Sequence, residues 1–137
     1  MPEPVRVPAG VWDQLLAHAD RDAPDECCGL LEYDPASASV VAAHPLVSAD
    51  PSPLRFALGS PDLLRLPEIE DRGLVPVIYH SHVRSVAEPS QTDLTFAANW
   101  PGVPWLIIGI AGPAPEVRWF EIEDGIARER PVERAAG

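Results

Sequence analysis

LVPVIYHSHVRSVAEPSQTD, residues 74–93, is the stretch around which the rest of this chain is organised. Its first six residues, 74–79, are apolar and rich in β-branched and aromatic side chains, which predicts a buried strand ending at the histidines. Successive strand side chains alternate between the two faces of a sheet, so His80 and His82 should project together while Ser81 points away. Two imidazoles that share a face in this way can chelate one metal ion.

A short helix is expected to begin near Ser90, because the apolar positions of residues 94–100 suit a helix that places Asp93 in its first turn. Two neutral imidazoles and one carboxylate suit a borderline cation such as zinc. Three protein ligands leave the fourth tetrahedral position for water, as in catalytic zinc sites, whereas a structural zinc would require four. We therefore predict one zinc ion per chain, bound by His80, His82 and Asp93.

Each part of this pattern also has a simpler interpretation. Ser90 and Asp93 alone are a capping box, which is common at helix starts. His80 and His82 alone are consistent with strand-end histidines that bond to the backbone. The chain has only four histidines, and two of them stand at one strand end, a short loop away from an acidic helix start. This conjunction favours a metal site.

A hydrolytic zinc site also needs a base, and Glu26 is the candidate, within residues 24–31, PDECCGLL. Its simpler interpretation is an exposed carboxylate at the start of a strand. A glutamate before a Cys-Gly-Leu-Leu strand, then His-Ser-His, seven residues, a serine, two residues and an aspartate is similar to the motif of the JAMM (MPN-type) zinc metalloprotease family. The resemblance spans residues 7–123, and small stand-alone bacterial members resemble this chain most in size.

The resemblance implies a role for each matching residue. It places the zinc ligands at His80, His82 and Asp93, and the general base that deprotonates the zinc-bound water at Glu26. It also implies that Ser90 helps to stabilise the tetrahedral oxyanion. Many family members have proline after the second histidine, where this chain has Val83; the difference concerns the conformation of the loop and leaves every metal-binding atom in place.

The remaining elements predict one α/β domain with a mixed β-sheet packed between helices, which agrees with the JAMM fold. With 137 residues the chain is long enough for a single domain, expected over residues 1–132, with a disordered end at 133–137. Helices are expected at 8–20 and from 60 onward, the second one interrupted by Pro67. Strands are expected at 27–33, 40–44, 55–58, 104–110, 116–122 and 126–132.

The net charge and the first residues of the chain give expectations about binding partners and cellular location. With 21 acidic and 10 basic residues the net charge is −11, which opposes binding to nucleic acid or to anionic membranes. The first residues show no signal peptide or membrane anchor, so the protein is expected in the cytoplasm. Its adjacent cysteines, Cys27 and Cys28, cannot form a secreted disulfide framework.

The leading functional hypothesis is a zinc-dependent peptidase or isopeptidase. The family resemblance implies that its substrate is a ubiquitin-like sulfur-carrier protein, cut after a C-terminal Gly-Gly. The alternatives are a noncatalytic interaction module of the MPN type and a general metallopeptidase without carrier specificity. A cysteine nucleophile at Cys27 or Cys28 is disfavoured, because cysteine beside apolar strand residues is far more often part of the core. The identity of the carrier, the released group and the oligomeric state stay open.

Overall fold

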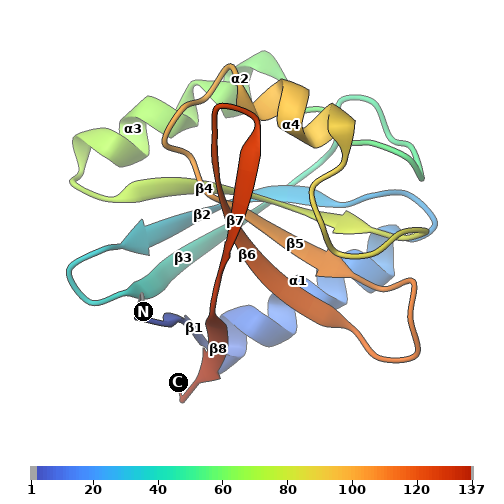
Figure 1. Ribbon diagram of the computed structural model, residues 1–137, viewed down its shortest axis with the longest axis horizontal. Helices are drawn as coiled ribbons and strands as arrows, with labels where there is room; N and C mark the ends of the chain where they lie inside the picture. Colours follow the sequence, from blue (N-terminus) through green and yellow to red (C-terminus); the bar gives the residue numbers. More distant parts are fainter. Residues whose placement is uncertain (1–2, 137) are drawn as a thin grey trace.

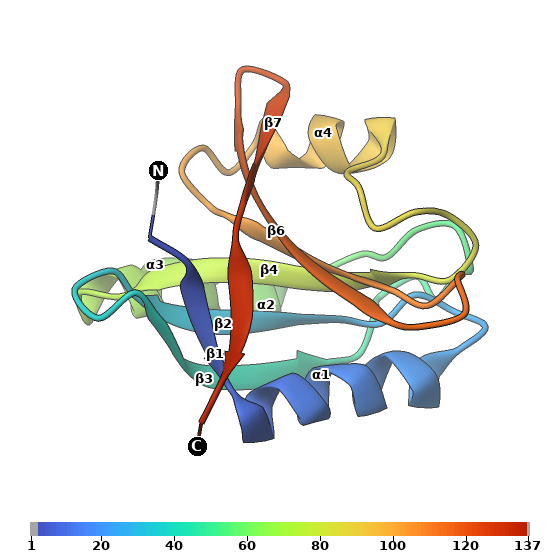
Figure 2. The ribbon, with the colours of Figure 1, turned by 60° about the horizontal axis from the view of Figure 1, so that its bottom comes forward.

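A mixed sheet of eight strands runs through the centre of the computed structural model, which describes residues 3–136 (Figure 1). Helix α1 covers one face of the sheet, and α2, α3 and α4 lie over the other (Figures 1 and 2). The predicted α/β architecture, with a mixed sheet between helices, is therefore confirmed. The elements in chain order are β1 Val5–Pro8, α1 Ala9–Asp22, β2 Cys28–Asp34, β3 Ser39–Leu46, α2 Ser60–Leu63, α3 Arg65–Asp71, β4 Val75–His82, α4 Gln91–Ala97, β5 Trp105–Gly109, β6 Glu116–Glu123, β7 Ile126–Arg130 and β8 Val132–Ala135.

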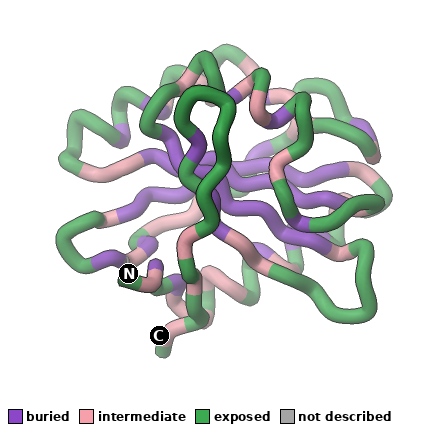
Figure 3. Tube along the Cα trace, viewed as in Figure 1, coloured by how far each residue is buried: buried purple, intermediate pink, exposed green. Residues whose placement is uncertain are grey.

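The strands are ordered β7-β6-β5-β4-β2-β3-β1-β8 across the sheet. Strand β4, which carries the two histidines, lies between β2, antiparallel to it, and β5, parallel to it. The parallel step from β4 to β5 is made by a crossover that contains α4, so the start of this helix is brought back over the end of β4. Figure 3 shows that burial is concentrated on these inner strands, while the loops around them are exposed.

Alternation along β4 gives the sheet a hydrophobic core on each face. Val77 and Tyr79 are in the cluster that includes Leu15 and Ala19 of α1. Ile78 is in the second cluster, with Leu66 and Ile69 of α3. Because side chains alternate with a period of two residues, His80 and His82 project to the same face as Ile78, beneath the helical layer that contains α4.

The last part of the chain runs from one edge strand of the sheet to the other. Strands β7 and β8 stand at opposite ends of the strand order, but only Pro131 separates them in sequence. The sheet therefore curls until its edges approach, and β7 and β8 follow each other as one long ribbon across it (Figure 2). The carbonyl of Pro131 accepts a hydrogen bond from Val5 N–H at 2.9 Å, which fixes the change from one edge to the other.

The structure corrects the predicted end of the chain. Residues 133–135, expected to be disordered, belong to β8, which pairs in parallel with β1 from Val5↔Val132 to Pro8↔Ala135. Their polar sequence carries no local signal for a strand, and the strand depends on backbone pairing with β1, a non-local contact. Residue 137 lies outside the described residues, as do residues 1–2.

The structure also differs from the expected secondary structure at several other points. Residues 55–58 are irregular and form no strand; the side chain of Phe56 packs inward. Strand β1 precedes α1 and was not predicted. The antiparallel pairing of β2 with β3 is confirmed. The second helical segment is divided at Leu64 and not, as expected, at Pro67, which lies in the first turn of α3.

His18, in the last part of α1, connects this helix to β4. Its side chain is buried, and its Nδ1 lies 2.7 Å from the hydroxyl of Tyr79. The Tyr79 ring lies directly over Gly29, where an added Cβ would come within 2.2 Å of the ring. Glycine at position 29 is therefore what allows Tyr79 to reach α1.

Candidate metal centre

The C-terminal end of β4 places both histidines in a buried position. His80 is paired with Cys28 of β2 and Ile107 of β5, and His82 is paired with Gly109 of β5. Strands on both sides restrict the backbone, so the direction of each imidazole is set by the pleat of the sheet. Ser81 points to the other face, as predicted, where its hydroxyl accepts a hydrogen bond from Cys27 N–H at 2.8 Å.

The capping box at the start of α4 places Asp93. Ser90 Oγ accepts a hydrogen bond from Asp93 N–H at 3.1 Å, and Ser90 N–H donates to Asp93 Oδ2 at 2.9 Å. The simpler interpretation of these two residues is thus correct as local structure. The same cap turns Asp93 Oδ2 toward β4, so capping and a possible metal-binding role are compatible in one residue.

Three electron-rich atoms meet at this point. His80 Nε2 and His82 Nε2 are 3.1 Å apart, and Asp93 Oδ2 lies 3.2 Å from the first and 3.1 Å from the second. Ligand atoms around a tetrahedral zinc with bonds of about 2.0–2.1 Å are separated by about 3.3–3.4 Å. The observed triangle is close to that size, so the residues present fit a zinc ion.

The hydrogen bond at the other ring nitrogen of His82 also favours a role for this residue as a metal ligand. Its Nδ1 donates to the carbonyl oxygen of Val86 at 2.7 Å, which leaves the Nε2 lone pair available for a cation. His80 Nδ1 is buried and has no hydrogen-bond partner among residues 3–136. With the lone pairs of both Nε2 atoms and a carboxylate oxygen this close together, a divalent cation would satisfy all three at once.

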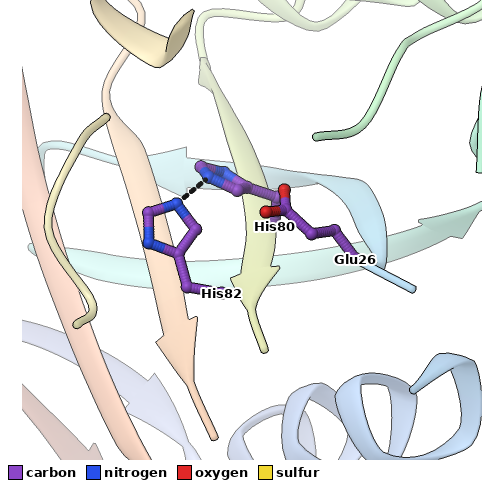
Figure 4. Close-up of side chains that lie close together, drawn as sticks. All are labelled: Glu26, His80 and His82. Atoms are coloured by element: carbon purple, nitrogen blue, oxygen red, sulfur yellow. Dashed lines mark hydrogen bonds between the residues drawn. The ribbon is translucent and has the colours of Figure 1, made fainter. Parts of the chain in front are cut away.

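Glu26 lies beside the histidines, at the end of the segment before β2 (Figure 4). One carboxylate oxygen of Glu26 and one nitrogen each of His80 and His82 lie within 4.8 Å of one another, so these three residues also form a group that could hold a metal ion. Two bonds fix the Glu26 backbone: its N–H donates to Ser52 O at 2.8 Å, and the adjacent Cys27 N–H donates to Ser81 Oγ.

Burial and neighbouring charges change the proton affinity of these groups. Burial raises the pKa of Glu26 to about 7, with a smaller opposing effect from His82. Burial lowers the pKa of His80, which favours the neutral imidazole that a metal requires. A carboxylate whose pKa is near neutrality can both accept and return a proton at physiological pH.

Hydrogen bonds and neighbouring charges outweigh burial in setting the pKa of His82 and of Asp93. Burial opposes the charged form of His82, but the hydrogen bonds to Asp93 and to the Val86 carbonyl outweigh it and raise the His82 pKa. Burial alone would raise the pKa of Asp93, yet the two histidines and the Ser90 N–H hold it well below its usual range. Asp93 is therefore an anion next to two imidazoles, which is a suitable donor set for zinc.

The structure thus brings together all five residues singled out from the sequence, with Glu26, His80, His82 and Asp93 buried and Ser90 exposed at the rim. Sequence reasoning missed the aromatic side chains around His80. Phe56 stacks on the His80 ring and Trp105 meets the same ring edge-on. A phenylalanine in an irregular loop has no local signal for such a role, whereas Trp105 could have been inferred from a strand beside β4.

Comparison with known proteins identifies the family. Residues 8–122 match the family described as prokaryotic homologs of the JAB domain. The chain therefore belongs to this family, and the JAMM (MPN-type) membership expected from the motif is confirmed.

Three curated relatives have similar sequences over most of their length. The CysO-cysteine peptidase of Mycobacterium tuberculosis is 36% identical over 127 residues, which cover 90% of this chain and 86% of that protein. The desampylase of Haloferax volcanii is 36% identical, covering 81% of this chain and 84% of the relative. The probable TtuB-protein conjugate cleaving protease of Thermus thermophilus is 37% identical, with 87% and 76% coverage.

Solved structures share the fold. A protein from Desulfitobacterium hafniense superposes with a TM-score of 0.80 at 28% identity, covering 96% of this chain and 93% of its own. A JAB1/MPN domain protein from Archaeoglobus fulgidus has a TM-score of 0.58 at 17% identity, with 93% and 97% coverage, and supports the fold alone. Among residues 3–136, no helix is long and apolar enough to cross a membrane.

Proposed function

We propose that this protein is a zinc-dependent peptidase or isopeptidase that cleaves after the C-terminal Gly-Gly of a ubiquitin-like sulfur-carrier protein. The observation that carries the proposal is the triangle of His80 Nε2, His82 Nε2 and Asp93 Oδ2, with edges of 3.1–3.2 Å, beside the buried carboxylate of Glu26. These three ligands would hold one zinc ion.

When bound there, zinc would supply a Lewis acid that lowers the pKa of a water molecule and polarises the scissile carbonyl. Glu26 accepts the proton of that water at its carboxylate as the oxygen forms a bond to the carbonyl carbon. Glu26 then delivers the same proton to the leaving nitrogen as the C–N bond breaks. The Ser90 hydroxyl, exposed at the rim, donates a hydrogen bond to the oxyanion.

The substrate class is supported by the relatives, which are named as a CysO-cysteine peptidase, a desampylase and a probable TtuB-protein conjugate cleaving protease. A Gly-Gly tail also suits a site formed at the end of a strand beneath a helix. Glycine has no Cβ, so an extended Gly-Gly segment can pass close to the backbone on both sides of the metal, whereas larger residues beside the cut would be excluded.

A noncatalytic interaction module is the second candidate. It would have no need for three ligands and a base in a buried cluster, and this chain retains all four. A general metallopeptidase would share the site and differ in its substrate. The two enzyme hypotheses are separated by what the protein cleaves, and both are separated from the module by whether it cleaves at all.

The test uses a purified ubiquitin-like carrier that ends in Gly-Gly followed by one cysteine. Incubation with the zinc-loaded protein should lower the intact mass of the carrier by one cysteine residue, as measured by mass spectrometry. Denatured casein, incubated in parallel, should be left intact. An unchanged carrier would overturn the proposed activity, and equal cleavage of casein would indicate a general metallopeptidase.

A further inference from the structure

The His80 side chain lacks the usual support of a metal-binding histidine. Such residues almost always donate the second ring N–H to a carboxylate, carbonyl or water, which orients the ring. His82 follows this rule through the carbonyl of Val86, but His80 Nδ1 has no hydrogen-bond partner in the described part of the chain. The torsion that turns an imidazole about its Cβ–Cγ bond is broad, so contacts with the faces and edges of the ring decide how far it can turn.

Aromatic side chains supply those contacts. The Phe56 ring stacks on His80 with centroids 4.5 Å apart and an angle of 25° between the rings. Trp105 meets His80 edge-on, with centroids 5.3 Å apart at 88°. The rings of Phe56 and Trp105 also pack together, with centroids 5.8 Å apart, so the two aromatic side chains support each other around the imidazole. A ring confined between a stacked face and a perpendicular neighbour cannot rotate without losing both contacts.

The loop that carries Phe56 is closed on itself, so the ring has a defined position. Ala49 N–H donates to Ala57 O at 2.8 Å, and Ala57 N–H donates to Ser48 Oγ at 3.0 Å. Within the loop, Arg55 Nε donates to Asp50 Oδ2 at 2.8 Å. The same loop accepts the Glu26 N–H through the carbonyl of Ser52, so it contacts both sides of the candidate site.

We propose that Phe56 is a positioning residue for the metal centre: by stacking on His80 it aims Nε2 at the point shared with His82 and Asp93, in place of a hydrogen bond at Nδ1. The inference rests on the proposed function, because it takes His80 as a metal ligand. It assigns to the loop of residues 48–57 a direct part in metal affinity, although that loop contributes no ligand.

The test measures zinc affinity by competition with a chromogenic chelator, which does not depend on activity. Phe56→Leu keeps an apolar side chain but removes the ring, and it should weaken zinc binding by about tenfold to a hundredfold, as for other groups that orient ligands. Phe56→Tyr restores the stack and should bind zinc with nearly wild-type affinity. The control is Ile122→Ala, a loss of apolar volume in the same core cluster on β6, which should lower the melting temperature and leave zinc affinity unchanged.

The outcomes separate the two proposals. Wild-type protein that binds no zinc would contradict the proposed function itself. Wild-type protein that binds zinc, with Phe56→Leu binding it equally well, would overturn the role of Phe56 alone. If Phe56→Leu does not fold, nuclear magnetic resonance of the wild type decides: ring currents from Phe56 should shift the His80 ring protons upfield, and resonances at ordinary positions would refute the stack.

Discussion

At the scale of single residues, the site depends on burial that acts differently on each group. Burial raises the Glu26 pKa toward neutrality and lowers that of His80, so one becomes a better proton acceptor and the other stays neutral. His80 is singled out from a local pattern at a strand end, whereas Glu26, far from it in sequence, is singled out through the family resemblance. Their environment could not be predicted, since Ser52 and Phe56 reach them from an irregular loop.

Glu26→Gln isolates the proton acceptor. Glutamine keeps the size and the backbone bond to Ser52 but cannot take a proton from water, so turnover should fall by about a hundredfold to ten-thousandfold. Zinc content and melting temperature should stay close to those of the wild type. The measurement is the initial rate of carrier cleavage, with zinc determined on the same sample, and a variant with normal turnover would refute the base assignment.

At the scale of secondary structure elements, β4 and α4 behave as the sequence predicts, because strand alternation and the capping box are local rules. Strands β1 and β8 were missed or misjudged because each is stabilised by pairing with the other across more than a hundred residues. β1 is only four residues long, so the alternation of its buried Val5 and Val7 is a weak signal, and two of the four residues of β8 are charged. The two elements that hold the proposed metal ligands were therefore predictable, and the edge that closes the sheet was not.

Ser90→Ala tests whether Ser90 both caps α4 and donates a hydrogen bond to the oxyanion. Loss of the Ser90 Oγ acceptor for Asp93 N–H should lower the free energy of unfolding by about 1 kcal/mol. Loss of an oxyanion donor should reduce turnover by about a hundredfold or more, far beyond what that loss of stability explains. Thr92→Ala, an exposed change in the same first turn, is the control for both measurements. A purely structural Ser90 would show the stability loss with normal turnover.

Glu32 on β2 contacts His44 on β3 and Arg72 just after α3. These contacts should make the stability of the protein depend on pH. Burial alone would raise the pKa of Glu32, but hydrogen bonds from His44 and from Arg72, the latter at 2.8 Å, lower it below the ordinary 4.5. A carboxylate with a depressed pKa contributes stability that is complete above about pH 4.5 and is lost as the pH falls through its folded-state pKa.

Denaturant unfolding of the metal-free protein measures this contribution. Glu32→Gln should be less stable than the wild type by about 1–3 kcal/mol at pH 7. The difference should shrink below pH 4.5, because the wild-type carboxylate becomes protonated there. Glu121→Gln on β6 removes an exposed carboxylate as the control. A difference between Glu32→Gln and wild type that is constant from pH 7 to pH 3 would contradict the ion-pair account.

At the scale of the whole molecule, the curled sheet positions a candidate site whose proposed ligands come from β4 and α4 and whose proposed base precedes β2. The net charge of −11 makes the chain as a whole acidic. Substrate choice is expected to depend on the surface around the candidate site as well as on the site itself. The carrier should be recognised by its folded body as well as by its tail, which no single motif in the sequence can specify.

Substrate choice is tested by changing the carrier. Replacing its last glycine by valine adds a branched Cβ next to the metal, and this should block cleavage at the concentrations at which the Gly-Gly form is fully cut. Intact-mass measurements on both carriers give the comparison, and melting curves show that both are folded. Equal cleavage of the valine carrier would contradict a narrow channel selective for Gly-Gly.

The central claim is that one zinc ion held by His80, His82 and Asp93 makes the protein a peptidase, and stoichiometric reconstitution tests it most directly. Metal-free protein is titrated with zinc while the rate of cleavage of the Gly-Gly-cysteine carrier is followed. The rate should begin near zero, rise linearly and stop rising at one zinc per chain, and His82→Ala should show no such rise. Full activity without metal, or a rate unaffected by zinc, would contradict the account.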